Sequence, residues 1–424
     1  MKVLIVNTSE KAGGAAVAAS RLTAALINNG VKAQMLVRDK QTDSLHVSAL
    51  PRQWLQRWRF LWERWLLFCH LHLHRKHLFD IDTATAGADI TRLPEFREAD
   101  IIHLHWVNQG MLSLGDLRRI VDSGKPVVWT MHDIWPATAL CHLTLSCQHF
   151  KTECRRCRLL PGGGSNTDLA HRVWRRKQRV MAHSNIIMVA CSRWLEGEAR
   201  QSKLLEGLHI TSVPNPIDTR VFHPLDQSEQ RQKLGLPADR RLLLFVSQRA
   251  TNVYKGIGYL IEACRLLAGQ QPDATKQMAV AILGSHADEL ASQLPFDTYP
   301  LGYVSDERQI AAIYSAADAF VLPSLSENLP NTIMEAMACG VPSVGFKVGG
   351  IPEEIDHRRN GYVARYRDAA DLAEGIRWTL FEADREELRR QCLHKVAACY
   401  SPHSVAMRYI EVYNQALALK HYQL

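Results

Sequence analysis

Short apolar runs rich in β-branched residues alternate along this chain with longer segments of helical periodicity. The runs are apolar on both faces, which is typical of parallel strands covered by helices on each side. Their alternation with helices predicts an α/β protein built on doubly wound parallel sheets. The predicted strands are residues 2–7, 33–37, 100–106, 127–132, 186–191, 210–213, 242–247, 279–284, 319–323 and 342–346.

A proline-containing segment, residues 213–224, separates this pattern into two similar halves. A chain of 424 residues suits two cores of roughly 200 residues each. We therefore expect domains at residues 1–214 and 215–402, and a C-terminal helix at residues 403–424 that packs back on the first domain. Because ligands bind at the carboxyl ends of parallel strands, we expect the site in a cleft between the two sheets.

The composition, with 46% hydrophobic and 22% charged residues, is that of an ordinary soluble protein. No apolar run approaches the ~20 residues that span a bilayer, and Met1 leads directly into a strand rather than a signal peptide. We therefore expect a cytoplasmic protein with reduced cysteines. The net charge of +8 would suit nucleic acid, a phosphate-bearing substrate or an anionic membrane, and it does not choose among them.

A predicted donor site lies in the second half, where the loop at residues 324–331 follows a strand and opens a helix. Free amides at such a helix start suit a diphosphate. Glu327 in the loop could reach a ligand hydroxyl, and Glu335, about one turn into the helix, could accept both hydroxyls of a ribose. Gly349 and Gly350 precede a helix that starts with proline, and they would let the backbone approach a ligand closely.

Two cations complete this site. Arg249 and Lys255 follow the strand at residues 242–247 and are placed to neutralise a leaving diphosphate. The backbone of residues 302–304 could line a base pocket. A glutamate pair on a surface helix is usually solvated charge, but this pair lies in an apolar, small-residue segment between loops at matching strand ends. That context favours a binding site.

The order and spacing of these motifs resemble the retaining glycosyltransferases of family 4, which adopt the GT-B fold of two facing Rossmann-like domains. The resemblance covers the second half closely and the first half more loosely. It runs through the E-x7-E spacing of Glu327 and Glu335, and through residues 335–342 (EAMACGVP), 349–353 (GGIPE) and 360–361 (NG).

This resemblance implies that Glu327 contacts the donor sugar, that Glu335 binds the ribose, and that Arg249 and Lys255 hold the diphosphate. The family usually spaces these cations five residues apart rather than six, which weakens the assignment of Arg249 more than that of Lys255. The remaining expected donor-binding residues are Gly14, Asn328, Leu329, Pro330, Asn331, Gly349 and Gly350.

In the first half, Gly14 begins a helix after the first strand, where either a plain tight turn or a ligand contact explains the glycines. In the resembled family this loop borders the cleft. His132 ends a predicted strand, and the family often has a histidine here that touches the donor sugar. His105 ends the preceding strand and points to the same region. A satisfied core histidine is the alternative at both positions.

The resemblance implies retention at the anomeric carbon without a covalent sugar–enzyme intermediate, so the protein's task is positioning and charge stabilisation. We expect no cofactor for catalysis, and the half of the chain with the predicted donor site has no Asp-x-Asp pair for a catalytic divalent ion. A structural metal is a separate expectation. Four clustered cysteines suit a tetrahedral structural zinc, with metal-free thiols as the alternative; these are Cys141, Cys147, Cys154 and Cys157.

Trp54, Trp58, Trp62 and Trp65 recur at helical spacing with arginines on both sides. The pattern suits an interfacial helix on an anionic membrane, or else a helix packed on the sheet of the first domain.

We therefore expect a glycosyltransferase that moves a sugar from a nucleotide-diphosphate sugar to a glycan acceptor, lipid-linked, in exopolysaccharide or envelope polysaccharide biosynthesis. It would act at the cytoplasmic face of the membrane, in peripheral contact with it. The alternatives are a nucleotide-sugar epimerase, a glycosyl phosphorylase and a non-enzymatic sensor. Because no recognition fold for nucleic acid is apparent, we expect no nucleic-acid partner.

Overall fold

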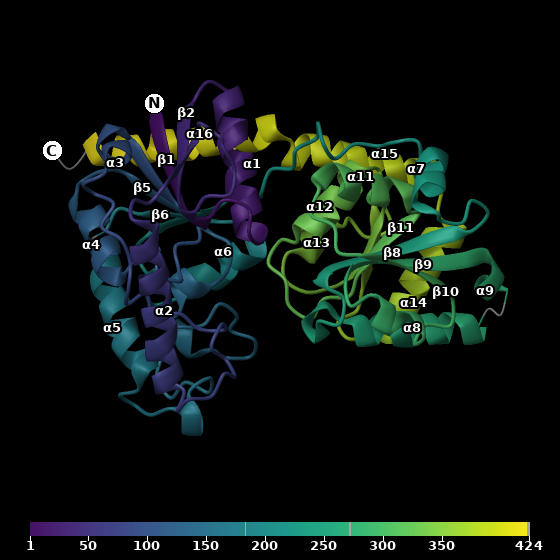
Figure 1. Cartoon of the computed structure of the whole chain (residues 1–424), viewed down its shortest axis with the longest axis horizontal. Coiled ribbons are helices and arrows are strands. Elements are labelled where there is room, and N and C mark those ends of the chain that lie inside the picture. The colour runs from purple at the N-terminus through teal and green to yellow at the C-terminus, as the bar shows by residue number, and fades with distance from the viewer. Residues whose placement is uncertain (183, 271–272, 422–424) are drawn as a thin grey trace. The chain divides into compact units, whose positions relative to one another are not determined.

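The computed structural model describes residues 1–182, 184–270 and 273–421 and divides into two compact units (Figure 1). Unit 1 comprises Met1–Pro216 together with the chain from Val405 onward, and unit 2 comprises Ile217–Ser404. Each unit has a parallel sheet with helices on both of its faces, as expected for a Rossmann-like domain. Within the described residues, no helix combines the length and the apolar character needed to cross a bilayer.

The sheet of unit 1 has seven parallel strands in the order β3-β2-β1-β4-β5-β6-β7. Because the order reverses between β1 and β4, their carboxyl ends mark the place where such sheets bind ligands. The strands are β1 (Lys2–Ser9), β2 (Lys32–Asp39), β3 (Val47–Ala49), β4 (Ile101–Leu104), β5 (Val127–Met131), β6 (Ile187–Ala190) and β7 (His209–Ser212). The helices are α1 (Gly14–Asn28), α2 (Gln53–His70), α3 (Pro94–Glu98), α4 (Leu114–Asp122), α5 (Leu169–Met181) and α6 (Arg193–Arg200), with short 3-10 turns η1 (Trp135–Ala137), η2 (His149–Lys151) and η3 (Pro161–Gly163).

Alternate residues of β1 enter two different apolar layers of unit 1. Leu4 and Val6 face the layer that includes side chains of α4 and α5, whereas Val3 and Ile5 face the layer of α1 and of the C-terminal helix α16 (Pro402–His421). The two layers explain why the strands of this sheet are apolar on both faces.

The sheet of unit 2 has six parallel strands in the order β10-β9-β8-β11-β12-β13, which reverses between β8 and β11. One face packs on α8 and α14, and on the other Phe320 packs edge-on against Tyr314 of α11 with ring centroids 5.6 Å apart. The strands are β8 (Arg241–Arg249), β9 (Met278–Ser285), β10 (Asp297–Gly302), β11 (Ala319–Leu322), β12 (Ser343–Phe346) and β13 (Gly361–Ala364). The helices are α7 (Gln227–Leu234), α8 (Ile257–Gln270), α9 (Ala274–Gln277), α10 (Asp288–Ala291), α11 (Glu307–Ala316), α12 (Asn331–Ala338), α13 (Ile351–Glu354), α14 (Ala369–Arg377) and α15 (Arg385–Lys395), with η4 (Val253–Lys255), η5 (Trp378–Glu382) and η6 (Val396–Tyr400).

The predicted fold class is confirmed, and each of the ten predicted strands overlaps an observed one. Three observed strands had no counterpart in the prediction: β3, β10 and β13. All three lie at sheet edges, where one side of the strand has no neighbour and a continuous apolar run is not required.

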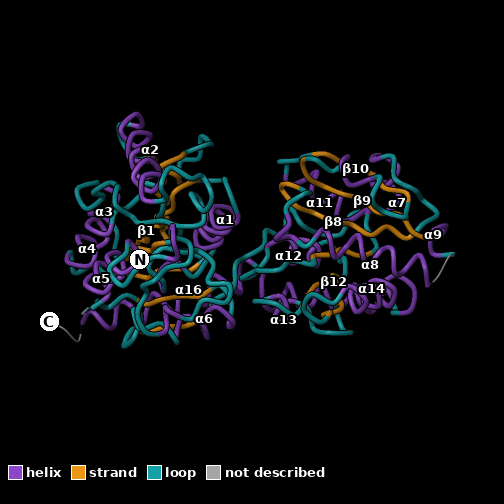
Figure 2. The backbone as a smooth tube through the Cα atoms, turned by 90° about the horizontal axis from the view of Figure 1, so that it is seen from below, coloured by secondary structure: helices purple, strands orange, loops and turns teal. Residues whose placement is uncertain are grey.

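The tryptophan-bearing segment forms α2, which lies at the outer side of unit 1 (Figure 2).

Candidate active site

The predicted donor residues of unit 2 lie at the carboxyl ends of β8, β11 and β12, three neighbouring strands. Lys255 ends η4, which follows β8, and Glu327 lies in the loop after β11. Gly349 and Gly350 follow β12 and lead into α13. Parallel strands end at one edge of a sheet, so the fold collects these separate motifs at a single place.

The ammonium group of Lys255 forms an ion pair with Oε1 of Glu327. Ser324 Oγ donates a hydrogen bond to the same oxygen at 2.9 Å. The two loops are also joined through the backbone, since Leu325 N donates to Tyr254 O at 2.9 Å. A lysine and a glutamate, 72 positions apart, are thus held together in a half-buried position that still reaches solvent.

Gly349 has φ +57°, and a Cβ built there would overlap the carbonyl oxygen of Glu327. Gly350 N donates to Asn328 O at 2.7 Å. We expected these glycines to admit a ligand, and the structure gives a second reason for them: they let the loop after β12 close on the loop that carries Glu327.

Glu335 lies in the second turn of α12, half-buried, with Tyr314 OH at 3.5 Å from its Oε2. Asn331 is the first residue of this helix, and Pro330 occupies the N-cap, where its ring has no acceptor to offer the first amides. Leu329 is buried beside it. The N-terminus of α12 follows the loop that carries Glu327 and Asn328, and the side chain at its N-cap position does not cap the first amides of the helix.

Arg249 is the last residue of β8, with an exposed side chain whose Nε donates to Thr251 Oγ1 at 3.1 Å. It lies at the same strand end as the Lys255 loop, and its role in diphosphate binding stays a prediction. Gly302 ends the edge strand β10, and the following Tyr303 is exposed.

Glu354, at the end of α13, was not anticipated from the sequence. It is wholly buried, and neither of its carboxyl oxygens has a hydrogen-bond partner among the described residues. Burial, followed by the nearby carboxylates of Glu327 and Glu353, raises its pKa well above the ordinary value. Burial thus favours the protonated form of Glu354 beside the Lys255–Glu327 pair. The sequence around it, a helix start with two glutamates, gave no signal of burial.

In unit 1, His105 and His132 directly follow β4 and β5 and contact one another, with 2.9 Å between His105 Nδ1 and His132 Nε2. Cys191 Sγ lies 3.5 Å from His132 Nδ1 and donates its proton to Asn215 Oδ1. Burial lowers the pKa of His132 to about 4, so the ring is neutral.

Gly14 is the first residue of α1, preceded by Gly13 at φ +91°. The structure therefore places Gly14 at the carboxyl end of β1, next to the reversal of strand order, as expected for a ligand-facing helix start.

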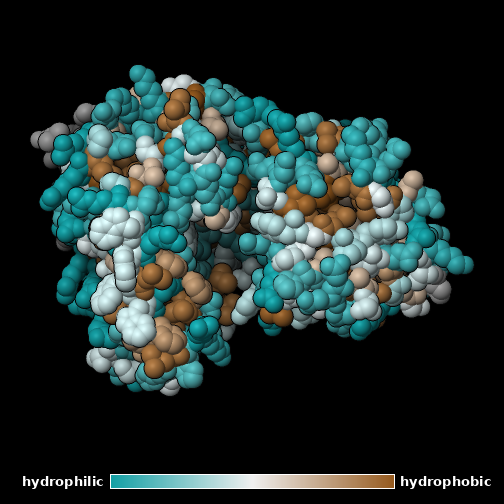
Figure 3. Space-filling view, viewed as in Figure 1, coloured by the Kyte–Doolittle hydropathy of each residue, from teal (hydrophilic) through white to brown (hydrophobic). Residues whose placement is uncertain are grey.

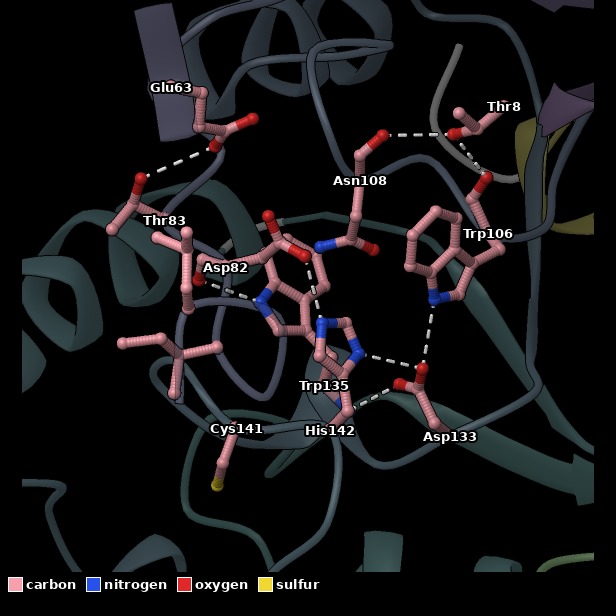
Figure 4. Close-up of polar contacts among 12 residues, drawn as sticks. Thr8, Glu63, Asp82, Thr83, Trp106, Asn108, Asp133, Trp135, Cys141 and His142 are labelled. Atoms are coloured by element: carbon pink, nitrogen blue, oxygen red, sulfur yellow. Dashed lines mark hydrogen bonds and ion pairs between the residues drawn. The ribbon is translucent and has the colours of Figure 1, made fainter. Parts of the chain in front are cut away.

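A buried polar network extends from the same edge of unit 1 (Figure 4). His142 lies between two carboxylates, with Nδ1 at 2.8 Å from Asp133 and Nε2 at 2.9 Å from Asp82. Burial alone would lower the pKa of His142, but the two carboxylates outweigh it and raise the pKa to about 10. Trp106 Nε1 donates to Asp133 at 2.9 Å, and Arg64 of α2 forms an ion pair with Asp82.

The four cysteines of the predicted zinc site are free thiols in the segment between β5 and α5. Cys154 is buried and the other three are half-buried. They lie close enough that each of the thiols at 141, 147 and 157 helps to raise the pKa of Cys154, after burial as the main cause. Within the described residues, however, no set of three or more histidine, cysteine or acidic side chains is arranged to hold a metal ion. The zinc site stays a prediction.

Two family models match this chain. The model described as Glycosyltransferase Family 4 matches residues 12–221, and the model described as Glycosyl transferases group 1 matches residues 240–381. The first therefore covers most of unit 1, and the second covers the strands and loops of the candidate donor site in unit 2.

Curated relatives point the same way. A D-inositol 3-phosphate glycosyltransferase of Thermobispora bispora is 27% identical over 57% of this chain and 60% of its own length. An alpha-maltose-1-phosphate synthase of Mycolicibacterium smegmatis is 26% identical over 78% of this chain and 83% of its own. The match to the first relatives spans only 40 to 60% of their length.

Solved structures share the fold across the whole chain. Sucrose-phosphate synthase from Thermosynechococcus elongatus has a TM-score of 0.67 at 17% identity, with 99% of each chain covered. The Anabaena protein HepE in complex with UDP-glucose has a TM-score of 0.61 at 18% identity, covering 98% of this chain and all of its own. With glycosyltransferase models matching both halves and this fold throughout, the chain belongs to the family 4 glycosyltransferases of the GT-B fold.

Proposed function

We propose that this protein transfers a sugar, with retention at the anomeric carbon, from a nucleotide-diphosphate sugar to a glycan acceptor. The observation that carries the proposal is the Lys255–Glu327 pair, held against Gly349 and Gly350 at the carboxyl ends of three adjacent strands. Such a site offers a cation for the departing diphosphate and a carboxylate for sugar hydroxyls. HepE, similar in fold, is a UDP-glucose complex, which supports a nucleotide-sugar donor here as well.

In this proposal Glu335 accepts hydrogen bonds from the ribose diol, and Glu327 accepts from the donor sugar once the diphosphate draws Lys255 away. Arg249, Asn328, Leu329, Pro330 and Asn331 complete the donor site, and Gly14 and His132 contact the donor from unit 1. The work of the protein is to orient the donor and to stabilise charge on the leaving diphosphate.

We further propose that the acceptor is lipid-linked and belongs to polysaccharide biosynthesis at the cytoplasmic face of a membrane. Such an acceptor would be met at a bilayer surface, and α2, with its four tryptophans, is the element that we propose to contact it.

The test is a thermal-shift panel of UDP-, GDP- and ADP-sugars on wild-type protein, Glu335→Ala and a matched control, Glu262→Ala. Glu262 is an exposed glutamate inside α8 and is not one of the proposed donor-binding residues. We expect at least one donor to stabilise wild type and the control equally, and to bind Glu335→Ala at least about tenfold more weakly, because charge-assisted hydrogen bonds are lost. Equal binding by all three proteins, or by none, would refute the donor-site assignment.

Product analysis separates the alternatives. A transferase releases a nucleoside diphosphate only with an acceptor and forms a glycoside with the configuration of the donor. A phosphorylase would need inorganic phosphate, an epimerase would release no nucleotide, and a sensor would bind donor without turnover.

A further inference from the structure

Helix α2 exposes its four tryptophans and buries three of its polar side chains. Tryptophans 54, 58, 62 and 65 are 63%, 64%, 56% and 55% exposed, and Leu61 between them is 54% exposed. The buried residues of the same helix are Gln56, Glu63, Arg64 and Leu67. A helix that only covered a core would show the opposite arrangement.

The inward face is fixed by polar contacts in the core of unit 1, and Figure 4 shows the contact between Glu63 and Thr83. Arg64 pairs with the wholly buried Asp82 and donates to Leu78 O at 2.7 Å. Glu63 Oε1 accepts from Thr85 N at 3.2 Å and from Thr83 Oγ1 at 3.3 Å. Turning the helix to bury its tryptophans would remove Arg64 from Asp82 and leave His142 as the partner of both Asp82 and Asp133, and breaking a buried ion pair is costly. The exposure of the tryptophans is therefore built into the packing of unit 1.

The helix also lies at the ligand-binding edge of unit 1. Gly110 belongs to the loop after β4, has φ +84°, and a Cβ on it would come within 2.9 Å of Phe60 N in α2. Arg38, near the end of β2, lies over the Phe60 ring at 5.2 Å. The inner side of α2 thus packs against residues at the carboxyl ends of β2 and β4, while its tryptophans are exposed.

The surroundings of the tryptophans are basic. Between Pro51 and Phe79 the chain carries six lysines and arginines and one acidic residue, Glu63, which is buried. Arg52, Arg57, Arg75 and Lys76 are exposed. Two further apolar side chains, Leu73 and Phe79, are 61% and 62% exposed on the turn that follows α2. Figure 3 shows apolar and intermediate side chains gathered over α2 and the lower end of this unit.

We propose that this surface, made of the tryptophan face of α2, Leu73, Phe79 and the four exposed cations, docks unit 1 onto a bilayer that carries anionic headgroups. Tryptophan favours the boundary between headgroups and acyl chains, and exposed lysine and arginine are attracted to an anionic leaflet. Glu63, the single acid of the segment, is turned inward, so the outward side is complementary in charge to such a leaflet. The docking would bring the carboxyl edge of the sheet to a lipid-linked acceptor, and this last link rests on the proposed function.

The test is flotation of the full chain with vesicles of phosphatidylcholine, alone or with about 30% phosphatidylglycerol, at low salt and at about 0.5 M salt. Trp58→Ser with Trp62→Ser removes the aromatic contact. Arg57→Gln, Arg75→Gln and Lys76→Gln together remove three exposed cations. Trp194→Ser is the matched control, because Trp194 is an exposed tryptophan (38%) that lies outside α2, in α6.

We expect wild type and the Trp194 variant to float with anionic vesicles, and salt to weaken that binding. The double tryptophan variant should bind at least about tenfold more weakly to anionic vesicles, and the charge variant should lose its preference for them. Unchanged melting temperatures would show that both variants fold. Unchanged flotation of both variants would overturn the proposal. A wild-type dimer that floats with neither kind of vesicle, and that the tryptophan substitutions convert to monomer, would also overturn it, because this face would then bind a second copy of the chain.

A failure of this proposal is distinguishable from a failure of the proposed function. Stabilisation by nucleotide-sugars reports on unit 2, and we expect it to be unchanged in the tryptophan and charge variants. Flotation without any donor binding would leave the docking surface intact and refute the transferase site instead.

Discussion

At the scale of single residues, the buried Glu63 links the stability of unit 1 to pH. Burial first, and the nearby Asp82 second, raise its pKa from 4.5 to about 7. The folded protein therefore holds a proton on Glu63 between pH 4.5 and 7 that the unfolded chain releases. Stability contributed by this group should be full below pH 4.5 and should fall as the pH rises through that window.

Glu63→Gln isolates this effect, since a glutamine oxygen can still accept from Thr83 and Thr85. We expect the variant to match wild type in thermal unfolding near pH 5 and to be more stable than wild type at pH 8, where wild type carries a buried negative charge. Equal melting temperatures for the two proteins at pH 8 would contradict the raised pKa of Glu63.

Gly349 provides a second test at this scale. An alanine there would meet the carbonyl oxygen of Glu327 as well as an unfavourable φ of +57°. We expect Gly349→Ala to weaken nucleotide-sugar binding by at least about tenfold, because the two donor loops can no longer close on each other. Gly235→Ala is the control: Gly235 also has positive φ, +65°, but open space around it. Equal donor binding by the two variants would show that loop closure at Gly349 is not needed.

Residues of the donor loops could be named from the sequence because each motif is short and follows a predicted strand, as the motifs of Glu327 and Gly349 do. The polar network of unit 1 could not. His142 meets Asp82 from 60 positions away, and nothing local marks either residue as half of a buried ion pair. The same limit applies to Glu354, whose burial depends on the packing of unit 2 around it.

At the scale of elements, the cysteine segment between β5 and α5 gives a metal prediction. Four thiols within one segment could bind a tetrahedral zinc ion, and we expect purified protein to contain about one zinc per chain. Cys154→Ser should lose the metal and lower the melting temperature. Cys264→Ser is the control, because Cys264 is a buried core cysteine in α8 outside the segment. Wild-type protein free of zinc after expression with added zinc would refute the site.

Helices and strands could be predicted from the sequence where the spacing of their apolar residues matched the faces that are buried in the structure. Central strands such as β8 are apolar on both faces and were found, whereas the edge strand β10 has only exposed and half-buried residues and was missed. For α2 the sequence left two environments open, since a tryptophan stripe suits either a membrane surface or a protein core. Burial in the structure decides against the core, because the stripe faces solvent.

At the scale of the whole molecule, the chain returns to unit 1 after it has completed unit 2. Tyr409 and Tyr413 of α16 are buried with Val3, Ile5 and Val128 of the unit 1 sheet. Tyr413 OH lies 2.7 Å from His103 Nδ1, and Tyr409 OH lies 2.9 Å from Thr130 Oγ1. Residues more than 270 positions apart therefore share one core, so unit 1 is complete only when the last helix is in place.

We therefore expect Tyr413→Ala to destabilise unit 1 by about 3–5 kcal/mol through the cavity it leaves, and Tyr413→Phe by about 1 kcal/mol through the lost hydrogen bond. Met407→Ala, at a half-exposed position of the same helix, should have little effect. Hydrogen–deuterium exchange should show faster exchange in β1, β4 and β5 of Tyr413→Ala, with β8 and β11 of unit 2 unchanged. Faster exchange in the strands of both units to the same degree would instead mean that the two sheets unfold together, and that α16 stabilises the molecule as one cooperative body.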